Sequence, residues 1–372
     1  MCVDVGGTRT KLAKFSSQKD YIEKTINTKD LFSDVDLVEK RFPATIRNLF
    51  DMEMKTLSKL VFAVPGPVNE AEGKIIHSTV LNGMLTWKRY NGFNFKECFG
   101  GLIGENNVHI LNDAQAAGIG CISAFPELKY PAMVLTLGTG CGTCLVHSNN
   151  LSSVQPAEWG LEKIDTRSQG RIDIHSCIGE AAIEHFRGQR WALDINEFYT
   201  DRTSRASELL IKKYEKTFCE KLKSIVFLGG KTEYINKRIL QQKLTGIDVI
   251  IQDDEKQKHV PLLGCYEHAL SIYEHRMKCW NGRKYCIGSC GEIVKDIQAR
   301  LEKYNYFNNG KVDGIFGKHT EDSIRRFQGD YNINGNGTAT PETLEKLYSD
   351  KVTSYDPGSE DYGSYGGPVY WS

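Results

Sequence analysis

Two similar glycine-rich turns constrain the fold of this chain more than any other feature. Residues 2–15 begin with an apolar strand that ends at Asp4, turn at Gly6-Gly7-Thr8, and return through a second strand. Residues 133–146 repeat this pattern around the turn Gly138-Thr139-Gly140. Internal self-similarity is typical of repeated architecture. The sequence therefore predicts two similar halves, each opened by a β-hairpin and continued by strands and helices.

The residue types of both turns suit a phosphate group. Glycines let backbone N–H groups approach an anion closely, and Thr8 and Thr139 add hydroxyl groups. A single Gly-Gly turn is more often only a hairpin connection. Two such turns that face one another could hold one phosphate chain from both sides, which is a stronger indication than either turn alone.

Between the two turns lies a strand that ends in two polar residues. Residues 108–111 are apolar, Asn112 and Asp113 follow, and a helix of small residues begins at once. An Asp at this junction can cap the helix. A carboxylate at the carboxyl end of a strand also lies where α/β sheets bind ligands, and there it could accept a proton from a substrate hydroxyl. This stretch alone leaves both interpretations open.

Apolar periodicity predicts further elements up to residue 275. The predicted strands cover residues 21–27, 59–64, 74–76, 224–228 and 248–251, and the predicted helices cover residues 36–54, 93–103, 176–188, 204–222 and 259–275. Residues 156–161 are expected to form a loop. Gly229-Gly230 follow a buried strand and precede a helix, which can lay backbone beside a nucleotide or simply allow close packing.

Composition excludes several functional classes. Lys plus Arg equals Asp plus Glu, at 47 each, so charge favours neither nucleic acid nor an anionic membrane as partner. No apolar run reaches the length of a membrane span, and no secretory signal is recognised before Asp4. The 11 cysteines are odd in number and scattered. This pattern favours reduced thiols and a cytoplasmic protein. Cys141 and Cys144 share one strand, where alternation places them on opposite faces.

Six short motifs, taken in order, resemble the ROK family of sugar kinases, and within it most closely the polyphosphate/ATP glucokinases. They are Asp4-Val-Gly-Gly-Thr8, Pro65-Gly-Pro67, Asn112-Asp113-Ala114, Leu137-Gly-Thr-Gly140, Glu158-Trp-Gly160 and Gly229-Gly230. The resemblance covers residues 1–276. It implies an α/β fold of two actin-like, ribonuclease H-like lobes around a cleft. The lobes are expected at residues 1–117 and 118–276, with the last helix closing on the N-terminal lobe.

The resemblance also implies roles for individual residues. Asp113 would be the catalytic base, and the sugar would be bound by Asn112 and Glu158, with Asn82 and Glu180 as further candidates. The phosphates would lie against the two turns, at Gly6, Gly7, Thr8, Gly138, Thr139 and Gly140. Asp4 would lie near Mg²⁺, which no protein residue is expected to ligate firmly, and Gly229 and Gly230 would lie against the adenosine. ATP is the expected phosphoryl donor, with polyphosphate as another.

Two departures from the family pattern leave the activity open. The family carries His at the position of Leu161, and its cysteine-rich zinc loop is reduced here to residues 176–181. The expected function is an ATP-dependent hexose kinase, acting on a glucose-like sugar. The alternatives are a kinase fold that has lost catalysis and serves as a scaffold in a large assembly, and a sugar or nucleotide sensor.

The last part of the chain has a different character. After a linker at 277–290, residues 291–347 resemble the three-helix peptidoglycan-binding-like domain, through Asp313-Gly-Ile-Phe-Gly317, Thr320 and Phe327-Gln328. The domain is expected to span residues 291–350, followed by a flexible Gly/Tyr/Ser-rich tail at 351–372. Its hallmark residues are mainly structural and therefore predict the fold better than the ligand. For a cytoplasmic chain they favour a protein partner, bound through residues 291–372.

Overall fold

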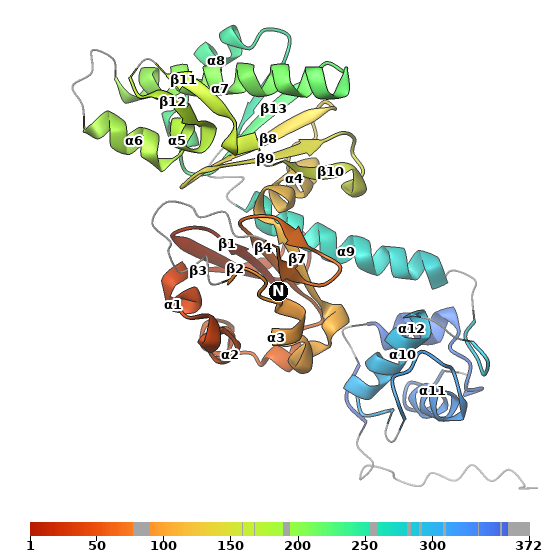
Figure 1. The fold of residues 1–372 in the computed structure, drawn as a ribbon. Coiled ribbons are helices and arrows are strands. Elements are labelled where there is room, and N and C mark those ends of the chain that lie inside the picture. The colour runs from red at the N-terminus through yellow and green to blue at the C-terminus, as the bar shows by residue number, and fades with distance from the viewer. Residues whose placement is uncertain are drawn as a thin grey trace, which may run out of the picture. The chain divides into compact units, whose positions relative to one another are not determined.

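A computed structural model describes most of the chain, which forms two compact units, Met1–Tyr273 and a second unit that begins at Glu274 (Figure 1). The described residues are 1–76, 90–157, 159–166, 168–188, 194–252, 259–280, 284–289, 292–307, 310–333, 335–349 and 352–355. Each unit is described separately below.

The first lobe of the first unit is built on a five-stranded sheet in the order β3-β2-β1-β4-β7. Its elements are β1 (Cys2–Val5), β2 (Arg9–Phe15), β3 (Tyr21–Asn27), α1 (Thr28–Phe32), α2 (Val38–Phe50), β4 (Leu60–Val64), β5 (Val68–Asn69), β6 (Lys74–Ile75), α3 (Phe95–Ile103) and β7 (Val108–Asn112). Helices α1, α2 and α3 lie on one side of the sheet in Figure 1, where Phe42, Phe62 and Phe99 pack together in a buried core.

The second lobe repeats this topology with the order β10-β9-β8-β13-β14. Its elements are β8 (Ala132–Leu137), β9 (Cys141–Val146), β10 (Val154–Ala157), β11 (Lys163–Thr166), β12 (Gly170–Asp173), α5 (Ile174–Ile178), α6 (Glu180–Arg187), α7 (Ile195–Phe218), β13 (Ser224–Leu228), α8 (Lys237–Lys243) and β14 (Asp248–Ile251). In both sheets an antiparallel hairpin leads into two parallel strands. The prediction of two similar halves is confirmed.

Two helices join the lobes. Helix α4 (Asp113–Ala124) leaves the first sheet, and α9 (Val260–Trp280) follows the last strand of the second sheet. Side chains of both helices and of both sheets share one buried core. The helices cross where Gly120 meets Gly264, because a Cβ on either glycine would lie under 3.0 Å from the backbone of the other helix. Small residues at this crossing let the two helices approach within backbone contact.

Three sequence-based assignments are corrected in the second lobe. Residues 154–157 form strand β10, where Pro156 is tolerated because the strand lies at the sheet edge. The helix predicted at 176–188 is two helices, interrupted at Gly179, whose backbone packs against the turn at Thr139 and Gly140. Helix α7 begins well before residue 204 because the Asp194 side chain caps it by accepting from the Glu197 N–H at 2.8 Å.

Alternation in β9 separates the two cysteines as predicted. Cys141 packs in the core of the second lobe, whereas Cys144 packs in the core shared by the two lobes. Burial raises the pKa of both thiols, so both are held in the neutral form. The two residues are therefore core residues, as the alternation along β9 indicated.

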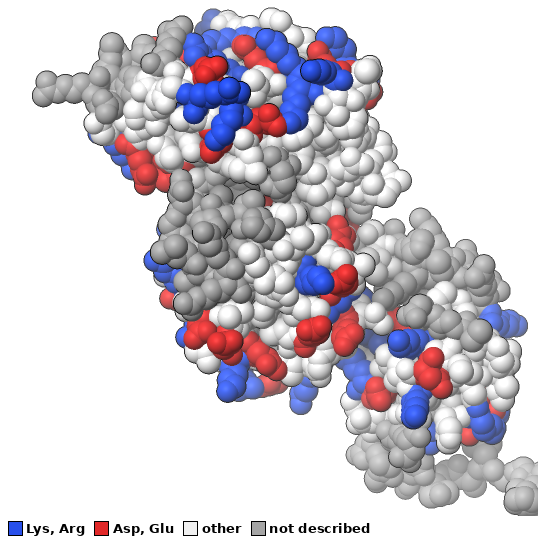
Figure 2. All heavy atoms as spheres, viewed as in Figure 1, with Lys and Arg blue, Asp and Glu red and all other residues white. Residues whose placement is uncertain are grey.

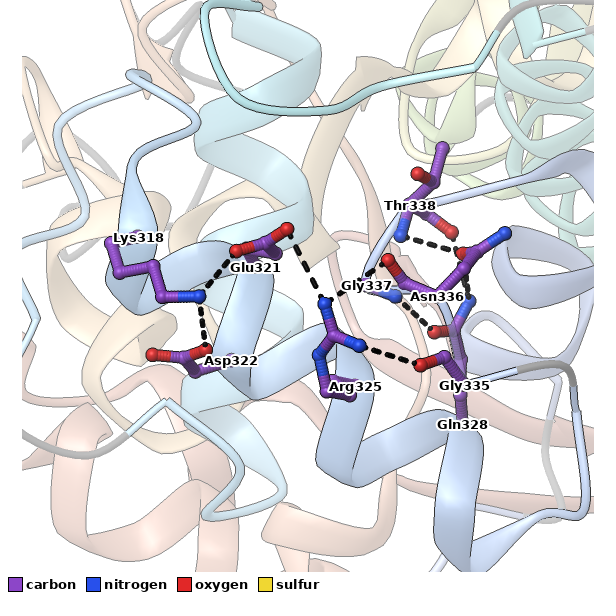
Figure 3. Close-up of polar contacts among 9 residues, drawn as sticks. All are labelled: Lys318, Glu321, Asp322, Arg325, Gln328, Gly335, Asn336, Gly337 and Thr338. Carbon is purple, nitrogen blue, oxygen red and sulfur yellow. Dashed lines mark hydrogen bonds and ion pairs between the residues drawn. The ribbon is translucent and has the colours of Figure 1, made fainter. Parts of the chain in front are cut away.

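The second unit contains α10 (Glu292–Lys303), α11 (Lys318–Asp330) and α12 (Pro341–Leu347) around a core that includes Ile297, Phe316 and Phe327. Two buried glutamines tie the loops to the helices. Gln298 accepts from the Gly314 N–H and donates to the Ile315 carbonyl. Gln328 accepts from the Gly337 N–H and donates to the Thr338 carbonyl (Figure 3).

The described surface mixes both signs of charge. Figure 2 shows basic and acidic side chains close to one another on the lobes, and ion pairs such as Lys221–Glu215 and Lys243–Asp201 account for part of this mixture. Within the described part of the chain, none of the helices combines the length and the apolar character needed to span a membrane.

Candidate active site in the first unit

A pocket of about 600 Å³ lies in the first unit and brings together residues of both glycine turns. Ten of the residues predicted from the sequence line it: Asp4, Gly6, Gly7, Asn112, Asp113, Gly138, Thr139, Gly140, Gly229 and Gly230. Elements of both lobes therefore contribute to one site.

Asn112 and Asp113 divide two tasks at the start of α4. The Asn112 side-chain oxygen accepts from the Ala114 and Gln115 N–H groups at 3.0 and 3.1 Å, so Asn112 is the helix cap. Its amide nitrogen donates to the Gly66 carbonyl at 3.0 Å. The capping interpretation considered for Asp113 thus applies to Asn112. Asp113 occupies the first helical position, where it accepts from the Ala114 N–H at 2.8 Å and lines the pocket.

The second glycine turn is open toward the pocket and held from behind. A Cβ on Gly138 would meet no atom within 4 Å, which leaves room for a ligand against the backbone. Behind the turn, the Glu180 N–H donates to the Thr139 carbonyl at 3.2 Å, and Gly179 packs on Gly140. The turn is therefore preorganised, as a site that stabilises negative charge through backbone N–H groups requires.

Asp4 lies at the first turn beside a lysine. Asp4 on β1, Lys11 on β2 and Thr25 on β3 occupy one row across the sheet, and all three line the pocket. Burial raises the pKa of the Asp4 carboxyl, and the positive charge of Lys11 opposes this shift. A divalent cation would favour the ionised form of Asp4 in the same way.

Gly229 and Gly230 differ in what they do. Gly229 has a φ of +101°, its N–H donates to the Gln252 side chain at 2.9 Å, and a Cβ there would collide with Leu137. The positive φ and the close contact with Leu137 both require glycine at position 229. A Cβ on Gly230 would meet no atom within 4 Å, so Gly230 offers open backbone to a ligand.

Several predicted residues are not brought into the pocket lining, or cannot be placed. Thr8 is exposed in the first turn and does not line the pocket. Glu180 forms an ion pair with Lys231 behind the second turn. Asn82 and Glu158 lie outside the described residues, although Ala157 and Gly160 on either side of Glu158 line the pocket. Leu161, at the position of the family His, is 51% exposed.

The structure adds pocket residues that the sequence analysis missed, notably Lys11, Gln252 and His175. Lys11 could have been found from strand register, because it pairs with Asp4 across the hairpin. No sequence signal pointed to His175, since its position depends on how α5 packs against β9.

Among the described residues, no group of three or more His, Cys, Asp or Glu side chains is arranged to hold a metal ion. Mg²⁺ usually keeps several waters and takes only one or two protein carboxylates. Asp4 beside the first turn is the carboxylate that would face such an ion.

Comparison with solved structures identifies the fold of the first unit. It matches an inorganic polyphosphate/ATP-glucomannokinase from Arthrobacter sp. strain KM with a TM-score of 0.53 and 17% identity, over 73% of this chain and 97% of that one. A ROK family glucokinase from Streptomyces griseus, in complex with glucose and AMPPNP, matches with a TM-score of 0.51 and 15% identity, over 72% and 98%. The predicted two-lobed, actin-like fold of ROK sugar kinases is confirmed.

The same fold also occurs in a ROK family transcriptional regulator, a homolog of the E. coli MLC protein. It matches with a TM-score of 0.52 and 14% identity, over 72% of this chain and 77% of that one. The fold by itself therefore does not decide between catalysis and regulation.

Sequence relatives match separate parts of the chain. The polyphosphate glucokinase of Mycobacterium tuberculosis is 32% identical over 102 residues, which are 26% of this chain and 38% of that protein. The spore cortex-lytic enzyme of Bacillus cereus is 40% identical over 77 residues, which are 21% of this chain and 29% of that enzyme. The chain thus spans well under half of the length of either relative. Residues 290–347 match the family described as putative peptidoglycan binding domain, which confirms the predicted C-terminal domain.

Proposed function

We propose that the first unit is a sugar kinase that transfers a phosphoryl group from ATP to a hydroxyl of a glucose-like hexose, with Mg²⁺ as cofactor and polyphosphate as an alternative donor. The observation that carries this proposal is one pocket in which Asp113 lies together with the glycine turns of both lobes, the second of which is open at Gly138. The solved sugar kinases with this fold, one of them in complex with glucose and AMPPNP, support it.

Each residue has a defined task in this proposal. Asp113 accepts the proton of the attacking sugar hydroxyl, whose oxygen forms a bond to phosphorus as the bond to the donor's bridging oxygen breaks. Backbone N–H groups at Gly7, Thr139 and Gly230 hold the phosphate oxygens, while the Gly138 N–H donates to the Gly140 carbonyl and shapes the turn. Mg²⁺, when bound, neutralises part of the phosphate charge near Asp4. Positioning and charge stabilisation carry most of the rate in such a reaction.

The test is a coupled kinase assay of the purified chain against a panel of hexoses, with MgATP and with polyphosphate as alternative donors. Turnover that depends on both a hexose and a donor is the expected result. Calorimetry with each ligand separately accompanies the assay. Binding of both ligands without turnover would contradict the kinase proposal and favour a sensor.

A sensor or scaffold is the second candidate function. The likeness to the ROK transcriptional regulator and the exposed Leu161 favour it. Under this proposal the pocket binds a sugar or a nucleotide. The bound ligand changes the arrangement of the two lobes and does not react. The calorimetric arm of the same experiment separates it from the kinase.

For the second unit we propose binding rather than catalysis. The residues that carry its resemblance are structural: Phe316 and Phe327 are buried, and the two buried glutamines tie its loops to its helices. The matched family is described by peptidoglycan binding, whereas a protein partner was expected from a cytoplasmic location. Co-sedimentation with insoluble peptidoglycan and pull-down from native extract, each with and without residues 284–372, distinguish the two ligands.

A further inference from the structure

His175 is the imidazole that lines the active-site pocket within the described part of the chain. It lies in the first turn of α5, which the Asp173 side chain caps by accepting from the Ser176 N–H at 2.7 Å. The ring packs over Gly160, where any Cβ would lie under 3.0 Å from Cε1 and Nε2. Gly160 therefore provides the space that the ring occupies.

One ring nitrogen has a fixed structural partner. The Cys141 N–H donates to His175 Nδ1 at 2.8 Å. A backbone N–H can only donate, so Nδ1 must be an acceptor without a proton. Because Cys141 directly follows Gly140, this bond also anchors the end of the second glycine turn.

The proton of the neutral ring is consequently on Nε2. Nε2 has no hydrogen-bond partner among the described residues. It is also not one of the fully buried side-chain atoms that lack a partner, so it keeps some accessible surface. Burial lowers the pKa of His175, while the charge of Asp173 opposes the shift. The ring is thus neutral, and its Nε2–H lies beside Gly160, which lines the pocket together with His175.

We propose that His175 donates a hydrogen bond from Nε2–H to an oxygen of the bound sugar, while Nδ1 holds the second glycine turn in place. This inference rests on the proposed function, because it adds a substrate contact to the same pocket. A neutral donor suits a sugar oxygen, whereas the proposed function places the phosphates against the second glycine turn and Gly230, where the backbone is open. One side chain would then connect the sugar side of the pocket to the phosphate side.

Two variants separate the two nitrogens. His175→Asn keeps an acceptor near the position of Nδ1 and removes the donor at Nε2. His175→Gln can place a donor near the position of Nε2 and removes the acceptor for the Cys141 N–H. His185→Asn, in α6 and away from the pocket lining, is the matched control.

Calorimetry with the hexose that binds the wild-type chain, and with a non-hydrolysable ATP analogue, measures both effects. His175→Asn is expected to weaken hexose binding about 10-fold, the usual effect of one neutral hydrogen bond, and to leave the analogue unaffected. His175→Gln is expected to weaken the analogue more than the hexose. Equal losses in both variants, or an unchanged hexose affinity in His175→Asn, would overturn the proposal.

A spectroscopic readout is independent of turnover. In protein labelled with ¹⁵N-histidine, the ring signals missing from His175→Asn identify His175. They are expected to show the Nε2–H tautomer, and to shift on adding hexose but not on adding the nucleotide analogue. A protonated ring or an Nδ1–H tautomer at neutral pH would contradict the inference. Hexose-dependent shifts without any turnover would support the contact between His175 and the sugar and would contradict only the kinase proposal.

Discussion

At the scale of single residues, Asn112 is what makes Asp113 available to the pocket. The first N–H groups of a helix need partners, and a cap contributes about 1 kcal/mol to stability. Asn112 meets this need with its side-chain oxygen and is held by its bond to Gly66. Asp113, one position later, can therefore serve a ligand without costing the helix its cap.

Replacing Asp113 by Asn is expected to lower turnover by about 10²- to 10⁴-fold, because the amide keeps the shape and removes the base. The cap remains on Asn112, so the melting temperature and the affinity for an ATP analogue should change little. Glu97→Gln, in the first turn of α3 outside the pocket, is the control in the same steady-state assay. Turnover near the wild-type value would exclude Asp113 as the base.

Replacing Gly138 by Val should abolish nucleotide binding without unfolding the protein. A Cβ on Gly138 meets no protein atom within 4 Å, so the added side chain projects into space that phosphate would occupy. Calorimetry with an ATP analogue and a thermal melt measure the two effects. Gly101→Val, which also adds a side chain into open space, controls for the loss of a glycine. Unchanged affinity in Gly138→Val would place the phosphates elsewhere.

At the scale of elements, the crossing of α4 and α9 sets how the lobes are connected. Each helix starts from one sheet and packs in the core that both sheets share. The contact at Gly120 and Gly264 is between backbones, which cannot move aside as a flexible side chain can. The two helices are therefore held at one crossing point. Residues in the first turn of each helix, Asp113 of α4 and Pro261 of α9, line the pocket.

Gly264→Ala is expected to destabilise the first unit by about 3 kcal/mol, the upper range for overpacking, because its Cβ would collide with the Ala116 carbonyl. Gly101→Ala in α3 has open space around the new Cβ and should instead stabilise by about 0.5–1 kcal/mol. Chemical denaturation of the two variants measures the difference. A Gly264→Ala protein as stable as wild type would show that the helices can separate at this point.

The C-terminal domain repeats one helix–loop device. Gln298 on α10 and Gln328 on α11 are both fully buried, and each pairs with the backbone of an Asx-Gly turn and with a threonine, Thr320 or Thr343. Asp313 and Asn336 occupy equivalent places, since each accepts from the N–H two residues later at 2.8 Å. The hallmark Phe-Gln pair is thus one half of an internal repeat.

Gln328→Ala should destabilise the second unit by about 3 kcal/mol, because the Gly337 N–H and the Thr338 carbonyl lose buried partners. Lys318→Ala removes ion pairs of an exposed side chain, drawn with the same network in Figure 3, and should have little effect. Thermal unfolding of the full chain reports both variants. A large loss in Lys318→Ala with none in Gln328→Ala would reverse this assignment.

The sequence predicted the sheets better than the contacts between elements. Strands at 21–27, 224–228 and 248–251 were placed to the residue, because apolar runs bounded by turns depend on local pattern. The position of His175 and the Gly120–Gly264 crossing could not be predicted, since each depends on packing between elements far apart in the sequence: α5 against β9, and α4 against α9. The roles of Asn112 and Asp113 depend on which one the first turn of α4 uses as its cap, and local pattern allows either.

At the scale of the whole molecule, each unit has its own core. The core clusters of the first unit are built from residues between Met1 and Ala269. Val294, Leu301, Ile324 and Leu344 are fully buried within the second unit. Residues 352–355, expected to begin a flexible tail, are packed there, with the Tyr355 N–H donating to the Tyr304 carbonyl at 2.8 Å. Two cores predict two unfolding transitions.

A chain truncated after residue 283 is expected to stay folded and to keep the hexose and nucleotide affinities of the full chain. It retains both sheets, α4 and α9, and loses only residues whose buried contacts lie in the second unit. Truncation after residue 252 is the control, because it removes Val260, Leu262 and Cys265 from the core shared by the lobes and should prevent folding. Calorimetric unfolding should show two transitions in the full chain and one in the longer truncated chain. If that chain were insoluble, or if its remaining transition moved to a lower temperature by more than a few degrees, the second unit would have to be counted as part of the kinase fold rather than as a separate binding domain.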